Sequence, residues 1–397
     1  MFALKLETLI SRTTVLDIEK YGVRVIINPY AGGFSRKDTL IKTSETLDTL
    51  LASTEHLVSR KPLSWDVLIT NAGRHATQLA NDLLETAALN TNQEWFVILA
   101  CGDGTTWEFL DGLTRAPREI VDRFTLLRLP LGTGNDGTDG WTLEDSLSRL
   151  FDAGTICRQP YVSIYPAKTG KQKQQAEHGF RAFNIVSIGL DAFVAHMTNK
   201  LKKRFPGDSF KLWLDLATVF YDSIYKTGTM KIEGYGSIEI FTASKLEQNS
   251  ISGNTDKHES GKTVRKPRKY EAIIRTESNR FSIQGQFLLL AVGADGRRTY
   301  GSHQLILPDE NNVCLIEKMS LFRKIKLKGP IVNGGHKQFP EVILAHATEL
   351  LVDYDEEILL QMDGESVLLE PTDFPLRITI AEPVIRYLGR NDGKRHA

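Results

Sequence analysis

Short apolar runs of strand length alternate with segments of helical periodicity through the first part of the chain. The apolar runs lie at 23–28, 65–70, 95–101 and 124–130. Between them, apolar residues recur three or four positions apart, the spacing that gives a helix one buried face. Consecutive parallel strands need a crossover, which is normally a helix, so the alternation predicts a parallel sheet with flanking helices.

Beyond residue 153 the sequence changes character. Runs rich in Val, Ile, Phe and Tyr, such as 281–292 and 350–362, are typical of β-strands. A chain of 397 residues exceeds the usual size of one domain. We therefore expect an α/β domain at residues 1–153 and a β-rich sandwich domain at 154–397. We leave open a return of the last segment to the first domain.

Charge and hydropathy exclude several classes of protein. The 49 basic residues balance the 49 acidic ones, which gives no support to a nucleic-acid binder. The three cysteines are scattered without the spacing of metal ligands, as is typical of reduced thiols in the cytosol. Charges interrupt the first twenty residues, and no apolar stretch is long enough to span a bilayer. We expect a cytoplasmic protein that does not span a membrane.

Two polar insertions, 168–178 and 245–269, have the composition of surface loops. The second ends in a basic cluster formed by Arg265, Lys266, Arg268 and Lys269. Exposure to solvent explains such a cluster, and contact with anionic lipid head groups is the alternative.

Three glycine-containing turns, 28–33, 101–105 and 131–136, each follow a predicted strand of the first domain. The carboxyl ends of parallel strands meet at one edge of a sheet, where ligands bind. Glycine lets backbone N–H groups approach an anion closely. Together the turns predict a phosphate site, although the third is equally compatible with a purely conformational role. The sequence contains no Walker-type loop and no dinucleotide-binding glycine pattern.

The second turn, Gly102-Asp103-Gly104, precedes a predicted helix. A carboxylate beside a helix N-terminus is well placed near phosphate and Mg²⁺. Thr105 and Glu108 have the spacing of a capping box, which would explain both residues without a ligand. Such a cap does not need Asp103, so a ligand-binding role is favoured for that residue.

The order of five short motifs resembles the diacylglycerol kinase catalytic family, which includes sphingosine, ceramide and bacterial lipid kinases. The resemblance spans about residues 23–385 and implies an ATP- and Mg²⁺-dependent phosphotransferase of lipid metabolism, with the phospholipid biosynthesis enzymes among its relatives. The acceptor would be the hydroxyl of a diacylglycerol or a sphingoid lipid. The motifs are Asn-Pro-x-x-Gly from Asn28, Gly-Asp-Gly-Thr with Glu108, Pro-x-Gly-Thr-Gly-Asn-Asp at 130–136, Ile-Gly-x-Asp-Ala at 188–192 and Asp-Gly-Glu at 363–365.

The resemblance also implies roles for individual residues. Asp191 matches the aspartate that holds the lipid head group in sphingosine kinases. The general base stays open between Asp103, as in sphingosine kinases, and Glu365, as in bacterial diacylglycerol kinases; we favour Asp103. The nucleotide would be bound by Asp363 of the second domain and by these residues of the first: Asn28, Pro29, Thr70, Arg74, Gly102, Gly104, Thr105, Glu108, Gly132, Thr133 and Asn135.

Two departures from the family pattern matter. Gly137-Thr138-Asp139 stands where relatives commonly have Phe-Ala-Arg, which removes a bulky residue and a cation near the site. Asp309 and Glu310 lie where bacterial members bind a structural Mg²⁺, and exposed acidic turn residues are the alternative.

We expect a lipid kinase that meets its substrate at the bilayer surface as a peripheral protein, and we leave a homodimer open. The alternatives are an NAD kinase-like small-molecule kinase and an inactive lipid- or nucleotide-binding protein. The sequence does not decide which lipid is the acceptor.

Overall fold

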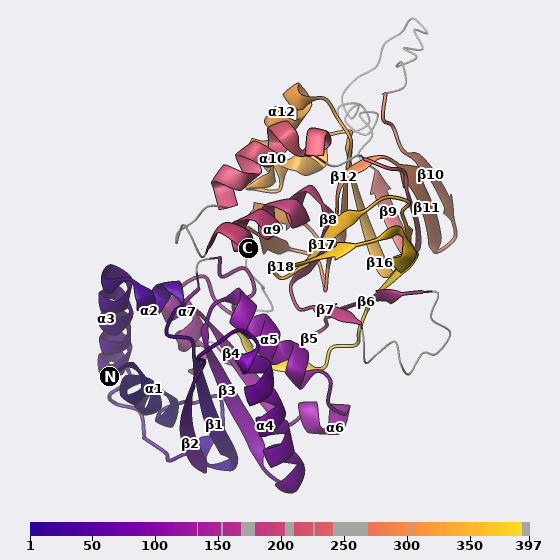
Figure 1. The fold of residues 1–397 in the computed structure, drawn as a ribbon. Coiled ribbons are helices and arrows are strands. Elements are labelled where there is room, and N and C mark those ends of the chain that lie inside the picture. The colour runs from indigo at the N-terminus through magenta and orange to yellow at the C-terminus, as the bar shows by residue number, and fades with distance from the viewer. Residues whose placement is uncertain are drawn as a thin grey trace, which may run out of the picture.

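The computed structural model describes residues 1–132, 134–151, 154–167, 179–202, 210–224, 227–240, 269–301 and 304–390. Thr133, the 168–178 insertion and the basic residues Arg265, Lys266 and Arg268 lie outside the described residues. Within them, strands form a six-stranded sheet, a twelve-stranded sheet and a two-stranded sheet. Figure 1 shows the first two as separate bodies with their helices around them.

The six-stranded sheet has the order β2-β1-β3-β4-β20-β5. The first four strands of this order pair in parallel, as the sequence predicts. Their bounds are β1 (Tyr21–Ile27), β2 (Ser64–Ile69), β3 (Glu94–Cys101) and β4 (Phe124–Pro130).

Both faces of this sheet are buried, because side chains alternate along each strand. Phe96 and Ile98 of β3 pack with Leu47 on one face, while Trp95 and Val97 pack with Leu110 on the other. The first face is covered by α1 (Phe2–Ser11), α3 (Lys37–Ser53) and α7 (Leu143–Ser148). The second is covered by α4 (His75–Leu89), α5 (Asp103–Leu113) and α6 (Arg118–Val121).

The two remaining strands of this sheet come from beyond residue 153. β20 (Ile385–Arg390) runs parallel to β4 and antiparallel to β5 (Gly154–Gln159). Residues 154–159, which the expected division assigned to the second domain, therefore pair in the first sheet. Residues 385–390, whose return to the first domain was left open, pair there as well. The chain crosses between the domains twice, after β5 and before β20.

The second body is β-rich and antiparallel, as expected. Within the described residues its strands form one hydrogen-bonded path, in place of two separate sheets. β16 (Val342–Asp353) makes the connection, since it pairs with β15 at residues 342–345 and with β19 at residues 349–352. The apolar side chains enclosed between these strands form the core of this domain.

The order of its main path is β10-β11-β9-β16-β15-β12-β8-β17-β18, with β19, β6 and β7 attached at β16. The bounds are β6 (Val162–Pro166), β7 (Phe180–Ala182), β8 (Ile185–Gly189), β9 (Met230–Ile240), β10 (Ile273–Glu277), β11 (Arg280–Gly285), β12 (Phe287–Gly293), β15 (Val313–Glu317), β17 (Ile358–Met362), β18 (Glu365–Leu369) and β19 (Leu376–Ile380).

Three helices pack on this sheet, α9 (Leu190–Lys202), α10 (Phe210–Ile224) and α12 (Leu321–Ile331), and α9 is the one nearest the first domain (Figure 1). Phe193 and Val194 of α9 and Leu214 of α10 are buried against β12 in a second core. Among the described residues, no helix has the length and apolar content needed to cross a bilayer. The small elements are α2 (Gly32–Ser35), η1 (Ile18–Lys20), η2 (Gly335–Gln338), η3 (Pro371–Asp373) and the hairpin β13 (Arg298–Tyr300) with β14 (Gln304–Leu307).

Candidate active site

A cleft of about 310 Å³ lies between the two domains, at the carboxyl ends of β1, β3 and β4. One wall is formed by the glycine turns of the first domain. The other is formed by α9 and by the turn between β17 and β18. Of the residues predicted from sequence, the cleft is lined by Asn28, Gly102, Asp103, Gly104, Thr105, Gly132, Asp191, Asp363 and Glu365.

The second and third glycine turns touch each other through their backbones. A Cβ atom on Gly132 would lie 2.7 Å from the Cα atom of Gly102, closer than real Cβ atoms approach backbone. The third turn is closed by Asn135, whose Oδ1 accepts from the Gly132 N–H at 2.7 Å. Asn135 has φ 60°, a conformation that asparagine adopts more readily than most residues. Glycine is therefore required here by close approach.

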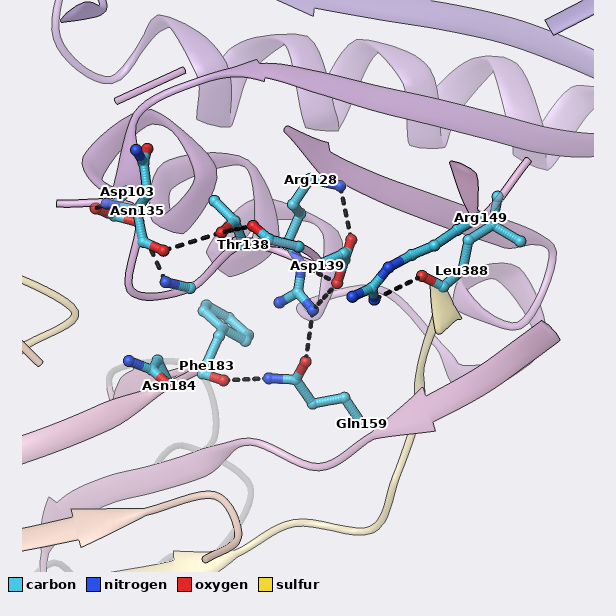
Figure 2. Close-up of polar contacts among 12 residues, drawn as sticks. Asp103, Arg128, Asn135, Thr138, Asp139, Arg149, Gln159, Phe183, Asn184 and Leu388 are labelled. Atoms are coloured by element: carbon cyan, nitrogen blue, oxygen red, sulfur yellow. Dashed lines mark hydrogen bonds and ion pairs between the residues drawn. The ribbon is translucent and has the colours of Figure 1, made fainter. Parts of the chain in front are cut away.

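Asp103 holds the third turn in place. Its Oδ2 accepts from the Asn135 N–H at 2.7 Å, and its Oδ1 accepts from the Gly137 N–H at 3.3 Å. Figure 2 shows the Asp103 carboxylate directed at this turn. Asp103 thus has a bracing role that the sequence analysis missed, because a pairing between turns far apart in the chain has no local signature.

The predicted capping box is wrong. α5 begins at Asp103 with Gly102 as its N-cap, so Thr105 lies inside the first turn of the helix. The Thr105 hydroxyl accepts from Asn28 Nδ2 at 2.9 Å and so links the first turn to the second. Glu108 accepts the N–H of Arg74, the N-cap residue of α4, at 2.8 Å. Both residues connect loops in place of capping their own helix.

The side chain of Glu365 places a carboxylate of the second domain beside the glycine turns. Its Oε1 lies 3.3 Å from the position that a Cβ atom on Gly104 would occupy. Gly104 is in the first turn of α5, where backbone N–H groups have no partner within the helix. A carboxylate of one domain therefore meets the N-terminus of a helix of the other.

Asp363 fixes the turn that carries Glu365. Its carboxylate accepts the backbone N–H groups of Phe183 at 2.5 Å, Ile185 at 2.9 Å and Asn184 at 3.0 Å. Burial raises the pKa of Asp363 to about 6, while these three donors lower it. α9 adds a further contact, because Asn199 Nδ2 donates to the Gly364 carbonyl at 2.6 Å.

Asp191 lies in the first turn of α9 and is only 3% exposed. Its Oδ2 accepts from the Ser187 hydroxyl at 2.6 Å and from Gln361 Nε2 at 3.1 Å. Burial raises the pKa of Asp191 to about 7, against the lowering effect of these two donors. A carboxyl group at the cleft wall thus changes charge near neutral pH.

The first domain matches a known family. Residues 22–158, which contain all three glycine turns, match the family model described as diacylglycerol kinase catalytic domain. This part of the chain resembles the catalytic domain of diacylglycerol kinases. The resemblance expected from the five motifs is confirmed.

Solved structures from Bacillus anthracis strain Sterne share the fold of the whole chain. One, provisionally described as a diacylglycerol kinase, has a TM-score of 0.54 and 16% identity, covering 95% of this chain and 99% of that chain. Another, described as a diacylglycerol kinase, has a TM-score of 0.52 and 14% identity over 95% of this chain and 99% of that one. The predicted fold class, an α/β domain followed by a β-rich domain, is confirmed.

The departure from the family pattern after Asp136 has a structural explanation. Asp139 is 2% exposed and accepts from Arg128 of β4, at 3.0 Å from Nε and 2.5 Å from Nη2 (Figure 2). Arg128 also lines the cleft. A guanidinium group therefore still lies at the cleft, contributed by the strand that leads into this turn and paired with Asp139.

Other residues predicted for the kinase-family site lie outside the cleft lining. Thr70 is buried at the end of β2, and Pro29 and Asn135 do not line the cleft. The predicted metal ligands lie elsewhere: Asp309 is 3.5 Å from Lys337 Nζ, and Glu310 pairs with Arg297 at 2.8 Å. No group of three or more metal-binding side chains occurs in the described part of the chain, so no third ligand joins these two carboxylates.

The cleft residues fit a polyphosphate with a divalent cation. Gly102 and Gly132 bring two turns into backbone contact with no side chain between them, and the N-terminus of α5 opens onto the cleft. Asp136 and Glu365 line the same cleft and carry the carboxylate oxygens that Mg²⁺ prefers.

Proposed function

We propose that this protein transfers the γ-phosphate of ATP to the hydroxyl group of a lipid, in the cleft between its domains. The observation that carries the proposal is the position of Glu365 against Gly104, between glycine turns suited to phosphates. A nucleotide bound by the first domain would place its terminal phosphate beside a carboxylate of the second. Phosphoryl transfer depends mainly on such positioning and on charge neutralisation.

Each side of the cleft has a proposed task. Gly102, Gly104 and Gly132 would bind the phosphates through backbone N–H groups, and Asp136 would hold Mg²⁺. The metal would neutralise charge on the phosphates. Asp191, whose pKa is about 7, would contact the polar head of the lipid.

The contacts of the two candidate bases favour Glu365 as the general base. The expectation from the sequence was Asp103. A general base must direct a lone pair at the hydroxyl that it deprotonates. Both oxygens of Asp103 accept backbone N–H groups of the third turn. We therefore assign Asp103 a positioning role and Glu365 the proton transfer.

An exposed apolar surface supports a lipid as the acceptor. α10 and α12 lie side by side, joined by the ion pair of Lys324 with Asp222 at 2.5 Å (Figure 1). α12 contains four basic residues and no acidic one. Apolar side chains beside basic ones fit the interface of an anionic bilayer. The exposed apolar residues of the two helices are Leu212, Leu216, Val219, Phe220, Ile224, Leu321, Phe322 and Ile325.

An acceptor panel tests the proposal. The full chain is incubated with Mg-ATP and diacylglycerol, monoacylglycerol, sphingosine or ceramide in vesicles, and with NAD as the small-molecule alternative. Mass spectrometry of the products identifies the acceptor. We expect one lipid class to gain a phosphate, whereas phosphorylation of NAD alone, or of none of the acceptors, would overturn the proposal.

A further inference from the structure

A second cavity, of about 610 Å³, lies beside the cleft at the junction of the domains. Arg128, Asp136 and Asn184 line both spaces. We call it the arginine cavity, because its walls contain Arg128, Arg149, Arg158, Arg297, Arg298 and Arg390. Figure 2 shows Arg128 and Arg149, which reach this region from the first domain.

Positive charge predominates on the cavity wall. The carboxylates among its lining residues are Asp136 and Asp139. The acidic partners of the other arginines do not line the cavity, and Asp145 is shared between two of them. These partners are Asp145 for Arg149 and Arg390, Asp122 for Arg158, Glu310 for Arg297 and Asp295 for Arg298.

Two buried guanidinium groups have donors without acceptors. Arg149 Nε and Arg298 Nη2 make no hydrogen bond to the described residues. The Arg149 side chain is 5% exposed, and its other contacts are long: 3.4 Å from Nη1 to the Leu388 carbonyl and 3.5 Å from Nη2 to Asp145. An unsatisfied buried donor is costly, and burial lowers the pKa of Arg149. An anion in the cavity would favour the charged form of Arg149.

We propose that the arginine cavity is a second anion site, separate from the cleft, which binds the phosphate group of a phosphomonoester. The planar forks of arginine match phosphate oxygens, and a dianion accepts from more of these donors than a carboxylate does. The cavity exceeds the size of one phosphate, so it also has room for an attached organic group. Inorganic phosphate, a soluble phosphomonoester and a phosphorylated lipid head group share this chemistry.

An anion bound in the arginine cavity would affect the cleft through Arg128. This residue pairs with Asp139, and the same loop donates the Gly137 N–H to Asp103. An anion that attracts Arg128 would therefore change the turn that faces the proposed nucleotide. The binding itself is independent of the proposed function, whereas this effect on catalysis rests on it.

Calorimetric titration of the full chain tests the binding. The probes are inorganic phosphate, glycerol 3-phosphate, and phosphatidylcholine vesicles containing phosphatidic acid, with sodium chloride at matched ionic strength as the reference. The variants are Arg149→Gln, Arg298→Gln and the milder Arg390→Gln, whose side chain is 47% exposed. Arg377→Gln is the matched control, since Arg377 also pairs with a glutamate, Glu349, but lies outside the cavity.

We expect saturable binding of inorganic phosphate or glycerol 3-phosphate, weakened about tenfold by each cavity variant and unchanged by Arg377→Gln. Gly104→Ala alters the cleft but not the cavity, and its Cβ atom would meet only the end of the Glu365 side chain, so it should leave this binding intact. Binding only to the vesicles would assign the phosphate to a lipid head group. The proposal is overturned if no probe binds above the chloride reference, or if Gly104→Ala removes the binding while the arginine variants retain it.

Discussion

The carboxylates at the cleft lie in different environments, which indicate different roles. Asp103 and Asp363 accept backbone N–H groups and hold two turns in place. Asp191 is buried with one hydroxyl and one amide donor. Glu365 extends from the second domain to Gly104. The sequence motifs marked all four residues, but only the contacts distinguish bracing groups from those directed at a substrate.

Asp191→Asn should make the protein more stable at pH 8. The pKa of Asp191 rises from 3.8 to about 7 on folding, so the folded state binds the proton more tightly than the unfolded state. Stability therefore falls as the pH rises from 3.8 to about 7 and stays low above that. Urea unfolding should give a gain on the order of 1–4 kcal/mol for the variant at pH 8.

That gain should disappear near pH 4, where the carboxyl group is protonated in the folded protein. Asparagine can accept the Ser187 and Gln361 hydrogen bonds, so packing is retained. If the wild type and the variant were equally stable at pH 8, folding would not raise the pKa of Asp191. If Asp191 contacts the lipid head, the variant should also lose lipid phosphorylation.

Asp103→Asn should weaken nucleotide binding more than it slows the chemical step. The amide retains one acceptor oxygen and places an NH₂ group against a backbone N–H, so the third turn loses a brace. We expect KM for ATP to rise about tenfold, corresponding to one lost charge-assisted hydrogen bond. Steady-state kinetics over a range of ATP concentrations measures this. A fall in kcat with KM unchanged would instead assign Asp103 to the chemical step.

At the scale of elements, the glycine turns depend on how closely the strand ends approach one another. A Cβ atom at Gly132 would lie 2.7 Å from the Gly102 backbone, whereas one at Gly73 would have nothing within 4 Å. Gly132→Ala should therefore destabilise the protein by about 1–3 kcal/mol and reduce ATP affinity. Gly73→Ala, in another strand-end turn, is the matched control and should be nearly neutral. Thermal unfolding and nucleotide titration of both variants compare them, and equal effects would contradict this account of the turns.

The elements also show which features of the structure can be predicted from the sequence. Strands β1 to β4 of the first sheet were predictable, because each is a compact apolar run between amphipathic segments. The turns were recognisable from glycine, which permits close backbone approach. The links between turns, Asn28 to Thr105 and Glu108 to Arg74, were not predictable. They join residues from separate elements, and the Thr-x-x-Glu spacing pointed to a cap that does not form.

At the scale of the whole molecule, the domain division was the least predictable feature. β20 lies between β4 and β5, although 225 residues lie between Gln159, the end of β5, and Ile385, the start of β20. Long-range pairing of this kind depends on tertiary packing, which short sequence patterns do not encode. It has a structural consequence, because two connections tie the domains together, and they leave the first sheet side by side at the paired residues Gln159 and Ile385.

The apolar surface of α10 and α12 should bind anionic vesicles. Phe322→Glu places a charge on a side chain that is 65% exposed, so it should reduce vesicle binding several-fold while leaving stability nearly unchanged. Leu89→Glu is the matched control, because Leu89 is 86% exposed at the end of α4 in the first domain. Vesicle sedimentation measures both. If both variants lost vesicle binding equally, or if neither lost it, another surface would make the membrane contact.

The most direct test of a shared active site is phosphate transfer by Glu365→Gln, because this residue joins the two domains across the cleft. Labelled phosphate from ATP is followed into the acceptor lipid by the wild type, by Glu365→Gln and by Glu310→Gln, which alters an exposed glutamate outside the cleft. We expect wild-type and Glu310→Gln proteins to label the lipid, and kcat of Glu365→Gln to fall by about 10²–10⁴. Wild-type rates for Glu365→Gln, or no labelled lipid with any of the proteins, would contradict the account.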